Sequence, residues 1–191
     1  HWNETFKQQP LVGRQAELGR ILDKLGLARQ GKGQVVGIVA EAGMGKSRLA
    51  AEAVHLAEMG GAQVFAGACQ SFGMNSAYLL WRGPWRKFFG LDVSLPVEAQ
   101  IVQLRQAVGQ LDPALVSRVP LLGLLLGLPS PENPLTQSLD AQRRKNSLEA
   151  LLVDCLKKRL SESDSVLIFL LEDLHWIDPL SRDLLETLAR A

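Results

Sequence analysis

The feature that most restricts the fold of this chain is a short apolar segment, followed directly by a glycine-rich turn and then by a helical pattern. Residues 34–39 are rich in β-branched side chains and bounded by glycines, which predicts a strand buried on both faces of a parallel sheet. The turn occupies residues 40–47, and apolar residues keep a helical period from Leu49 to about Met59. A strand, a turn and a helix in this order predict an α/β fold.

The rest of the chain alternates between helical and strand patterns. The segment after residue 71 carries aromatic residues at helical spacing, with Pro84 expected to break or kink the helix, and we interpret this stripe as core. Asp178 and Pro179 have the order of a helix N-cap and first helical residue. The other predicted elements are helices at 16–28, 95–115, 137–160 and 180–191 and strands at 62–67 and 166–171.

Composition narrows the classes of protein that fit the chain. Its 191 residues have room for one large domain, 47% of them are apolar, and 21 basic residues nearly balance 20 acidic ones, so nucleic acid is not indicated as a partner. The longest apolar run, Val119 to Leu128, is well short of the roughly 20 residues that span a bilayer, and no secretory signal is visible. Cys69 and Cys155 lack metal-ligand spacing and are expected to be buried. We therefore expect a cytoplasmic location and no membrane partner.

The turn at residues 40–47 has the composition of a phosphate-binding loop. A phosphate needs several backbone N–H donors that converge on it, and a glycine-rich turn at the start of a helix supplies them. Lys46 is placed to reach the outer phosphates of a nucleotide, and the Ser47 hydroxyl is placed to bind Mg²⁺. The usual pattern has glycine where this chain has Ala40, and alanine fits there only if its backbone φ is negative.

Two acidic residues, Glu172 and Asp173, follow the strongest strand signal, Val166 to Leu171. A carboxylate at the carboxyl end of a buried strand beside a phosphate loop can hold the metal and orient a water. Taken alone, the pair is equally well explained as a cap on the next turn, but together with Lys46 and Ser47 it indicates a functional site. Strand register decides which acid faces the metal. We expect Glu172 near the metal and Asp173 near the water.

Three segments carry a family resemblance when taken in order: Leu11–Leu18, Gly43–Leu49 and Leu171–Pro179. Together they resemble the nucleotide-binding domain of the AAA-like signal-transduction ATPases with numerous domains, close to the origin-recognition-like AAA group. The chain looks most like the ATPase segment of large bacterial proteins that carry an adenylate/guanylate cyclase domain in front and tetratricopeptide repeats behind. Related segments occur in large ATP-binding transcription regulators.

The resemblance implies a P-loop AAA-like ATPase domain at residues 10–191, after a linker or tail at 1–9, with ATP and Mg²⁺ as cofactors. Ala40 to Ser47 correspond to the Walker A loop and Leu167 to Asp173 to the Walker B strand. The implied catalytic residues are Lys46, Glu172 and Asp173, and the implied metal ligands are Ser47 and Glu172. The implied nucleotide-binding residues are Ala40, Glu41, Ala42, Gly43, Met44, Gly45, Lys46, Ser47 and Arg48, with Val12, Gly13 and Arg14 near the adenine.

The resemblance also implies how the sheet is completed. A parallel sheet flanked by helices would carry a mostly helical insertion at 72–135, between the second strand and the Walker B strand. Two further strands that flank the P-loop strand in this fold class are expected after residue 191, so we expect a domain truncated before its last strands. A sheet without an inner strand has unpaired backbone groups, and residues 1–191 alone are therefore expected to be marginally stable or aggregation-prone.

Three residues bear on whether ATP is hydrolysed. Ala40 replaces a glycine, and the acidic pair begins with Glu172 where such families often have Asp, which favours binding over efficient hydrolysis. His175 matches the family pattern after the Walker B strand and is either a phosphate sensor or an ordinary hydrogen-bonding residue at a helix entry.

Two functions fit these observations. The first is an ATP-hydrolysing switch that alters contacts with a fused effector or sensor domain outside this chain, in a multidomain signalling or transcription-regulating protein, with nucleotide-dependent self-association as a further expectation. The second is a nucleotide-binding scaffold for assembly with little hydrolysis. A kinase on the same loop is disfavoured because no acceptor-binding lid motif is visible. The loop itself does not separate ATP from GTP, so ATP rests on the resemblance.

Overall fold

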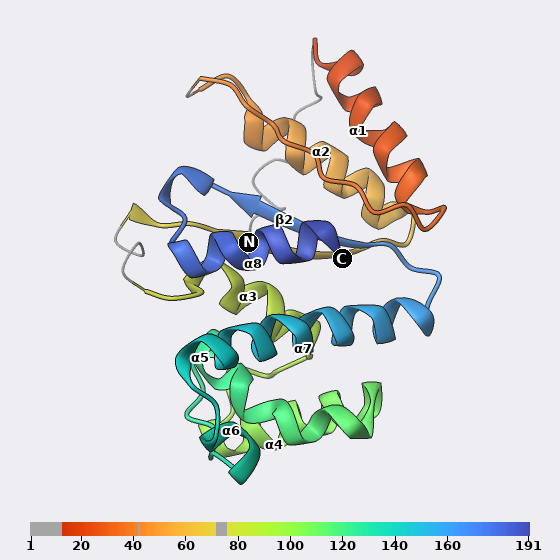
Figure 1. The fold of residues 1–191 in the computed structure, drawn as a ribbon. Helices are drawn as coiled ribbons and strands as arrows, with labels where there is room; N and C mark the ends of the chain where they lie inside the picture. The colour runs from red at the N-terminus through yellow and green to blue at the C-terminus, as the bar shows by residue number, and fades with distance from the viewer. Residues whose placement is uncertain (1–12, 42, 72–75) are drawn as a thin grey trace. The chain divides into compact units, whose positions relative to one another are not determined.

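A computed structural model describes residues 13–41, 43–71 and 76–191 of the chain (Figure 1). These residues form helices and one small sheet. The chain divides into two compact units, each with its own packing. The first unit comprises His1–Val64 and Asp164–Ile168, and the second comprises Phe65–Ser163 and Phe169–Ala191.

The described residues contain eight α-helices, two strands and two 3-10 helices of three or more residues. The α-helices are α1 (Gln15–Ala28), α2 (Lys46–Met59), α3 (Leu79–Phe88), α4 (Val97–Leu111), α5 (Leu122–Leu126), α6 (Pro134–Gln137), α7 (Ala141–Ser161) and α8 (Pro179–Arg190). The strands are β1 (Gln63–Ala68) and β2 (Leu167–Glu172), and two 3-10 helices are η2 (Pro113–Leu121) and η3 (Leu174–Trp176).

The two predicted strands at 62–67 and 166–171 are confirmed, each shifted by one residue, and they pair with each other. At one end the Gln63 N–H donates to the Val166 carbonyl at 2.9 Å, and at the other the Cys69 N–H donates to the Glu172 carbonyl at 3.0 Å. Both partners advance along the chain together, so the pair is parallel. The carboxyl ends of β1 and β2 therefore lie at the same edge.

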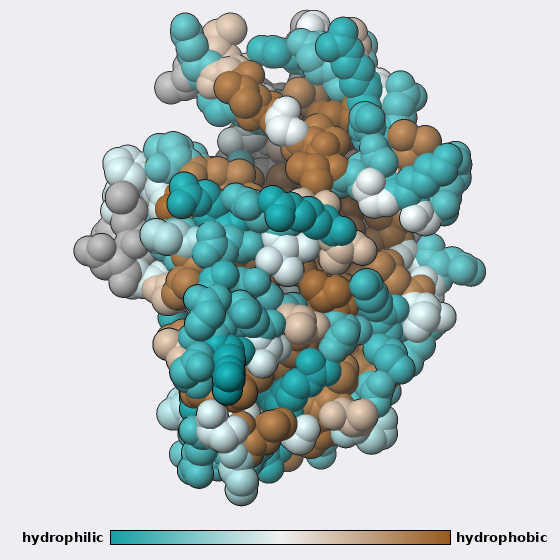
Figure 2. Space-filling model, viewed as in Figure 1, coloured by the Kyte–Doolittle hydropathy of each residue, from teal (hydrophilic) through white to brown (hydrophobic). Residues whose placement is uncertain are grey.

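The prediction of a strand at residues 34–39 is wrong for this structure, in which residues 32–41 form neither strand nor helix. A strand requires hydrogen bonds to a neighbour, and the described residues contain no strand that pairs with this segment. Val35 is 70% exposed and Val39 is 95% exposed. The apolar side chains that predicted a buried strand are therefore not buried. Figure 2 shows apolar residues gathered on the surface over α2 and this segment.

The aromatic stripe of α3 forms the core of the second unit, as predicted. Trp81 and Trp85 are fully buried, and the Phe169 ring of β2 lies with its centroid 5.8 Å from Trp81 and 5.6 Å from Trp85. The expected break at Pro84 does not occur, because α3 continues to Phe88.

The helix continues because the carbonyl that Pro84 leaves unbonded is accommodated by its neighbour in β1. Pro84 has no N–H for the Leu80 carbonyl four residues before it. That carbonyl lies against Gly67, so closely that a Cβ at position 67 would overlap it. Gly67 is therefore the residue that lets β1 pack on a helix with an internal proline.

The bounds of two predicted helices differ from the prediction because a polar side chain caps a helix at a position that the apolar pattern does not predict. The helix predicted at 95–115 ends at Leu111, because Asp112 is extended and caps η2 by accepting from the Ala114 N–H at 2.8 Å. The helix predicted at 137–160 begins at Ala141, where Asp140 accepts from the Arg143 N–H at 2.8 Å.

The last helix, α8, begins as predicted. The Asp178 carboxylate accepts from the Ser181 N–H at 3.0 Å, and Pro179 is the first helical residue. The Trp81 indole N–H donates to the Ser181 carbonyl at 3.0 Å, which joins α3 to the first turn of α8. Cys69 and Cys155 are both buried, as expected. Within the described ranges, none of the helices has both the length and the apolar character needed to cross a bilayer.

Candidate functional site

The glycine-rich turn enters α2 with the backbone shape that its composition predicted. Gly43 has φ 78° and Gly45 has φ 77°, both in the left-handed region where a side chain would be strained. Gly45 is the N-cap of α2 and has no side chain with which to cap it. The amides of the first helical turn point along the axis without helical acceptors, and the helix dipole adds positive potential at this end. Such an end is suited to bind an anion.

Ala40 occupies the first position of the turn without strain. Among the described residues other than glycine, Tyr78 and Asp173 have positive φ. Ala40 does not. The condition for replacing glycine by alanine is therefore met, and the turn keeps its path through the two glycines that follow. Ala42, which precedes Gly43, lies outside the described residues.

The Lys46 ammonium lies across the turn that precedes it. It donates to the Ala40 carbonyl at 2.7 Å and to the Glu41 carbonyl at 2.8 Å. An ammonium has three N–H donors, so one remains for an acceptor outside the turn. These two bonds hold the positive charge beside the N-terminus of α2. An anion bound there would interact with both the ammonium and the helix dipole.

The next two residues of α2 differ in what their side chains do. Ser47 is in the first turn of the helix and is half-buried, and its hydroxyl is a hard oxygen donor of the kind that Mg²⁺ prefers. The Arg48 guanidinium forms an ion pair with Glu52, one turn further along α2, at 3.1 Å. Arg48 was predicted as a nucleotide-binding residue, and in this structure its side chain lies along α2.

Arg14 connects the start of α1 to the turn. Its Nη2 donates to the Met44 carbonyl at 2.8 Å and its Nη1 pairs with Glu17 at 3.0 Å. The pKa of Glu17 is lowered by a backbone hydrogen bond and by Arg14. Gly13, before it, has φ 76°, and Val12 lies outside the described residues. The segment expected near the adenine thus touches the phosphate loop, through a contact that no sequence pattern indicated.

The acidic pair lies at the end of β2. Glu172 is the last residue of the strand, and Asp173, exposed and with φ 55°, turns the chain into η3. Successive strand residues point to opposite faces, and the Phe169 face packs on α3. Glu172 is therefore on the face of the sheet that points away from α3.

The carboxyl ends of the two strands share one electrostatic environment. Cys69 follows β1, and burial raises the pKa of its thiol, with further increases from the Asp178 and Asp173 carboxylates. Asp178 also accepts from the Tyr78 N–H at 3.5 Å, which holds Tyr78 in a left-handed conformation with φ 59°. The aromatic stripe includes Tyr78, but no local pattern predicts its left-handed backbone, because that conformation depends on a partner 100 residues away.

His175 lies in η3 directly after the acidic pair. Its side chain is exposed, and its ring centroid is 5.0 Å from that of Trp176. The turn is closed by the Trp176 N–H, which donates to the Asp173 carbonyl at 3.0 Å. The position is compatible with either role considered for this imidazole, sensor or helix-entry residue.

The structure groups the predicted site residues in two sets. Arg14, Lys46 and Ser47 lie with the glycine turn in the first unit, whereas Glu172 and Asp173 lie in the second. The first set offers backbone amides and an ammonium, which are suited to bind an anion, and the second offers carboxylate oxygens. No group of three or more His, Cys, Asp or Glu residues converges as a metal site in the described part of the chain.

Comparisons with known proteins show the family of the chain. Residues 10–191 match the family described as AAA ATPase domain. An uncharacterized protein of Rhizobium meliloti (strain 1021) is 31% identical over 188 residues, which is 95% of this chain and 17% of that protein. The chain therefore corresponds to a small part of this much longer relative. No solved structure matches the chain significantly.

Proposed function

Since the chain belongs to the AAA ATPase domain family, we propose that it binds ATP with Mg²⁺ and hydrolyses it as the nucleotide-dependent switch of a larger protein. The observation that carries the proposal is the position of the Lys46 ammonium, held by the Ala40 and Glu41 carbonyls at the N-terminus of α2. A fixed cation beside unbonded helix amides is a site for a polyphosphate.

Each residue of the turn has a separate task in this proposal. The amides between Gly43 and Ser47 bind the inner phosphates, and the free N–H of Lys46 binds an outer one. Arg14 occupies the Met44 carbonyl with a hydrogen bond of 2.8 Å and so holds the shape of the turn. Ser47 would hold Mg²⁺, which supplies neutralisation of the phosphate charge when it is bound.

The acidic pair would act on the same triphosphate. Glu172, on the sheet face away from α3, would contribute an oxygen to the metal. Asp173, exposed at the end of β2, would accept a hydrogen bond from the attacking water and orient it.

Segments outside this chain would respond to the nucleotide state of the domain. The relative with 31% identity is several times longer than the matched region, and such length leaves room for further domains. We propose that the bound nucleotide changes contacts with a fused effector or sensor domain, in a signalling or transcription-regulating protein, and that self-association depends on the nucleotide.

The test uses the full-length protein and measures ATP binding by calorimetry and turnover by phosphate release. Lys46→Ala should weaken ATP binding roughly tenfold or more, because a charge-assisted hydrogen bond is lost. The matched control is Lys32→Ala, which removes the same charge from an exposed position outside the turn and should bind ATP normally. Unchanged ATP affinity in Lys46→Ala would contradict the proposed phosphate site.

Hydrolysis is tested separately at the acidic pair. Asp173→Asn keeps a residue that tolerates positive φ and should lower turnover roughly a hundredfold while ATP still binds. Asp164→Asn, an exposed residue in the turn before β2, is the control. If the wild-type protein binds ATP with no turnover above background, the non-hydrolysing scaffold is the correct function.

A further inference from the structure

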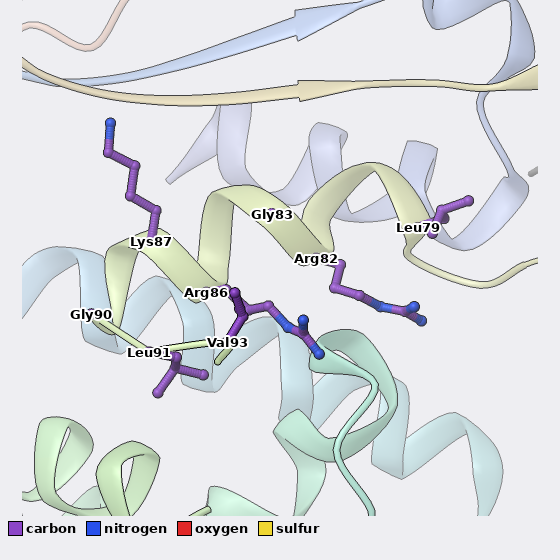
Figure 3. A pocket seen from close by; sticks show the side chains of 8 residues that line it. All are labelled: Leu79, Arg82, Gly83, Arg86, Lys87, Gly90, Leu91 and Val93. Carbon is purple, nitrogen blue, oxygen red and sulfur yellow. The ribbon is translucent and has the colours of Figure 1, made fainter. Parts of the chain in front are cut away.

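A second hollow, separate from the glycine turn, lies within the second unit beside α3. Its volume is about 620 Å³, and it is open to solvent (Figure 3). The eight lining residues come from α3 and the turn after it: Leu79, Arg82, Gly83, Arg86, Lys87, Gly90, Leu91 and Val93. Three of them are basic and none is acidic, so the lining has a strong local positive charge although the whole chain is nearly neutral.

Two of the basic side chains lie side by side. Arg82 and Arg86 are one helical turn apart on α3, and in Figure 3 their guanidinium groups extend in the same direction. Lys87 extends away from them, with its ammonium 6.0 Å from the centroid of the Phe65 ring. The guanidinium groups of Arg82 and Arg86 are therefore the charged groups that a ligand in the hollow would meet. The Lys87 ammonium is directed elsewhere.

The C-terminal end of α5 lies against both arginines and bonds one of them. Arg86 Nε and Nη2 donate to the Leu126 carbonyl at 3.1 and 2.8 Å. Arg82 lies over Gly127, where an added Cβ would be 2.9 Å from its Cζ. Because Arg86 is already bonded, a ligand need not immobilise this long side chain when it binds, which lowers the entropic cost of binding.

The two cations have no anionic partner in the described part of the chain. Neither forms an ion pair with a described carboxylate, and the Arg82 Nε is buried without a hydrogen-bond acceptor. Burial and the neighbouring Arg82 charge lower the pKa of Arg86, which reflects the mutual repulsion. Two adjacent guanidinium groups that no carboxylate neutralises are an arrangement that an anion stabilises.

The remaining lining is aliphatic. Leu79, Leu91 and Val93 border the hollow, and Val93 is 62% exposed. An exposed apolar side chain beside two arginines suits a molecule with an anionic head and an apolar body.

We propose that the hollow formed by Arg82, Arg86 and the aliphatic residues 79, 91 and 93 binds a small organic anion, a carboxylate or phosphate carried on an apolar chain. The two guanidinium groups bond the anionic head, and the apolar chain lies on the aliphatic lining. Because the site is on α3, which packs in the core of the second unit, it offers a place for an effector other than the nucleotide.

Calorimetry on the full-length protein tests the proposal with three probes of equal chain length: octanoate, octyl phosphate and octanol. Wild-type protein should bind at least one of the two anions and bind octanol at least about tenfold more weakly, because octanol lacks the charge. Binding of octanoate alone or of octyl phosphate alone identifies the head group. Equal binding of octanol and both anions overturns the proposal.

Variants locate the site. Arg82→Gln should weaken anion binding about tenfold, since it removes one of the two guanidinium charges that line the hollow. Arg105→Gln on α4 is the control, an exposed arginine with the same change of charge. Lys46→Ala should bind the anion like wild type. If Arg82→Gln binds like wild type, or if Lys46→Ala loses binding, the anion binds elsewhere and the proposal is wrong.

Discussion

The Arg14 guanidinium donates a hydrogen bond of 2.8 Å to the Met44 carbonyl, 30 residues further along the chain. This contact joins the start of α1 to the glycine-rich turn, whose other side-chain support is the Lys46 ammonium. The turn is therefore stabilised by its neighbours: Arg14 outside it and Lys46 within it. Nucleotide affinity should depend on both.

Arg14→Ala should weaken ATP binding several-fold, up to about tenfold, because the Met44 carbonyl loses a charge-assisted bond and the turn loosens. Calorimetric titration with ATP measures the change. Arg20→Ala, exposed on the same helix, should have no effect. Glu17→Gln removes the exposed ion pair but leaves the carbonyl bond, so its effect should be much smaller than that of Arg14→Ala. Equal effects of the two would mean that the ion pair, and not the carbonyl bond, holds the turn.

Gly67→Ala should destabilise the second unit by about 1–3 kcal/mol, because its Cβ overlaps the Leu80 carbonyl and lies 3.0 Å from Pro84 Cγ. Urea unfolding followed by tryptophan fluorescence reports the change, since Trp81 and Trp85 lie in this core. Gly83→Ala is the matched control. Its Cβ would have its nearest neighbour at 3.8 Å, and alanine in a helix should be neutral or stabilising. A normal midpoint for Gly67→Ala would show that β1 and α3 can separate without cost.

Asp178→Ala should lower the free energy of unfolding by about 2 kcal/mol, because one buried carboxylate caps α8 and also accepts from the Tyr78 N–H. Asp140→Ala removes the exposed cap of α7, which has no second task, and should cost less. The comparison is made by chemical denaturation of both variants under one set of conditions. If the two variants lose the same free energy of unfolding, the hydrogen bond from the Tyr78 N–H to Asp178 contributes nothing to stability.

Stability should fall at alkaline pH. Burial raises the pKa of Cys155 from 9.0 to about 12, and burial also raises that of Tyr78 from 10.0 to about 12. Above pH 9 the unfolded chain loses these protons while the folded chain keeps them, so the unfolding free energy decreases with pH up to about 12. Cys155 alone contributes a slope of about 1.4 kcal/mol per pH unit within that window.

Denaturation midpoints measured from pH 7 to 11 check this slope. Cys155→Ala should give a flatter decline above pH 9, although the variant is less stable at pH 7 because of the lost core volume. A wild-type midpoint that stays constant to pH 11 would contradict the buried, protonated thiol.

Much of the local structure was predictable because it depends on neighbouring residues in the sequence. The positive φ of Gly43 and Gly45, the cap by Asp178 and the two strands β1 and β2 all appear where the pattern placed them. The strand expected at residues 34–39 failed for a reason that no local pattern contains. Strand pairing needs a partner, and the described residues provide none.

The sequence by itself determined the residues able to bind phosphate and the conformations that suit them, since turn shape, helix capping and apolar period act over a few residues. Only the tertiary structure decided that Arg14 bonds the turn, that Gly67 accepts the carbonyl freed by Pro84, and that Arg82 and Arg86 stand together without a carboxylate. These contacts join residues that packing brings together, and packing depends on the whole set of buried side chains at once.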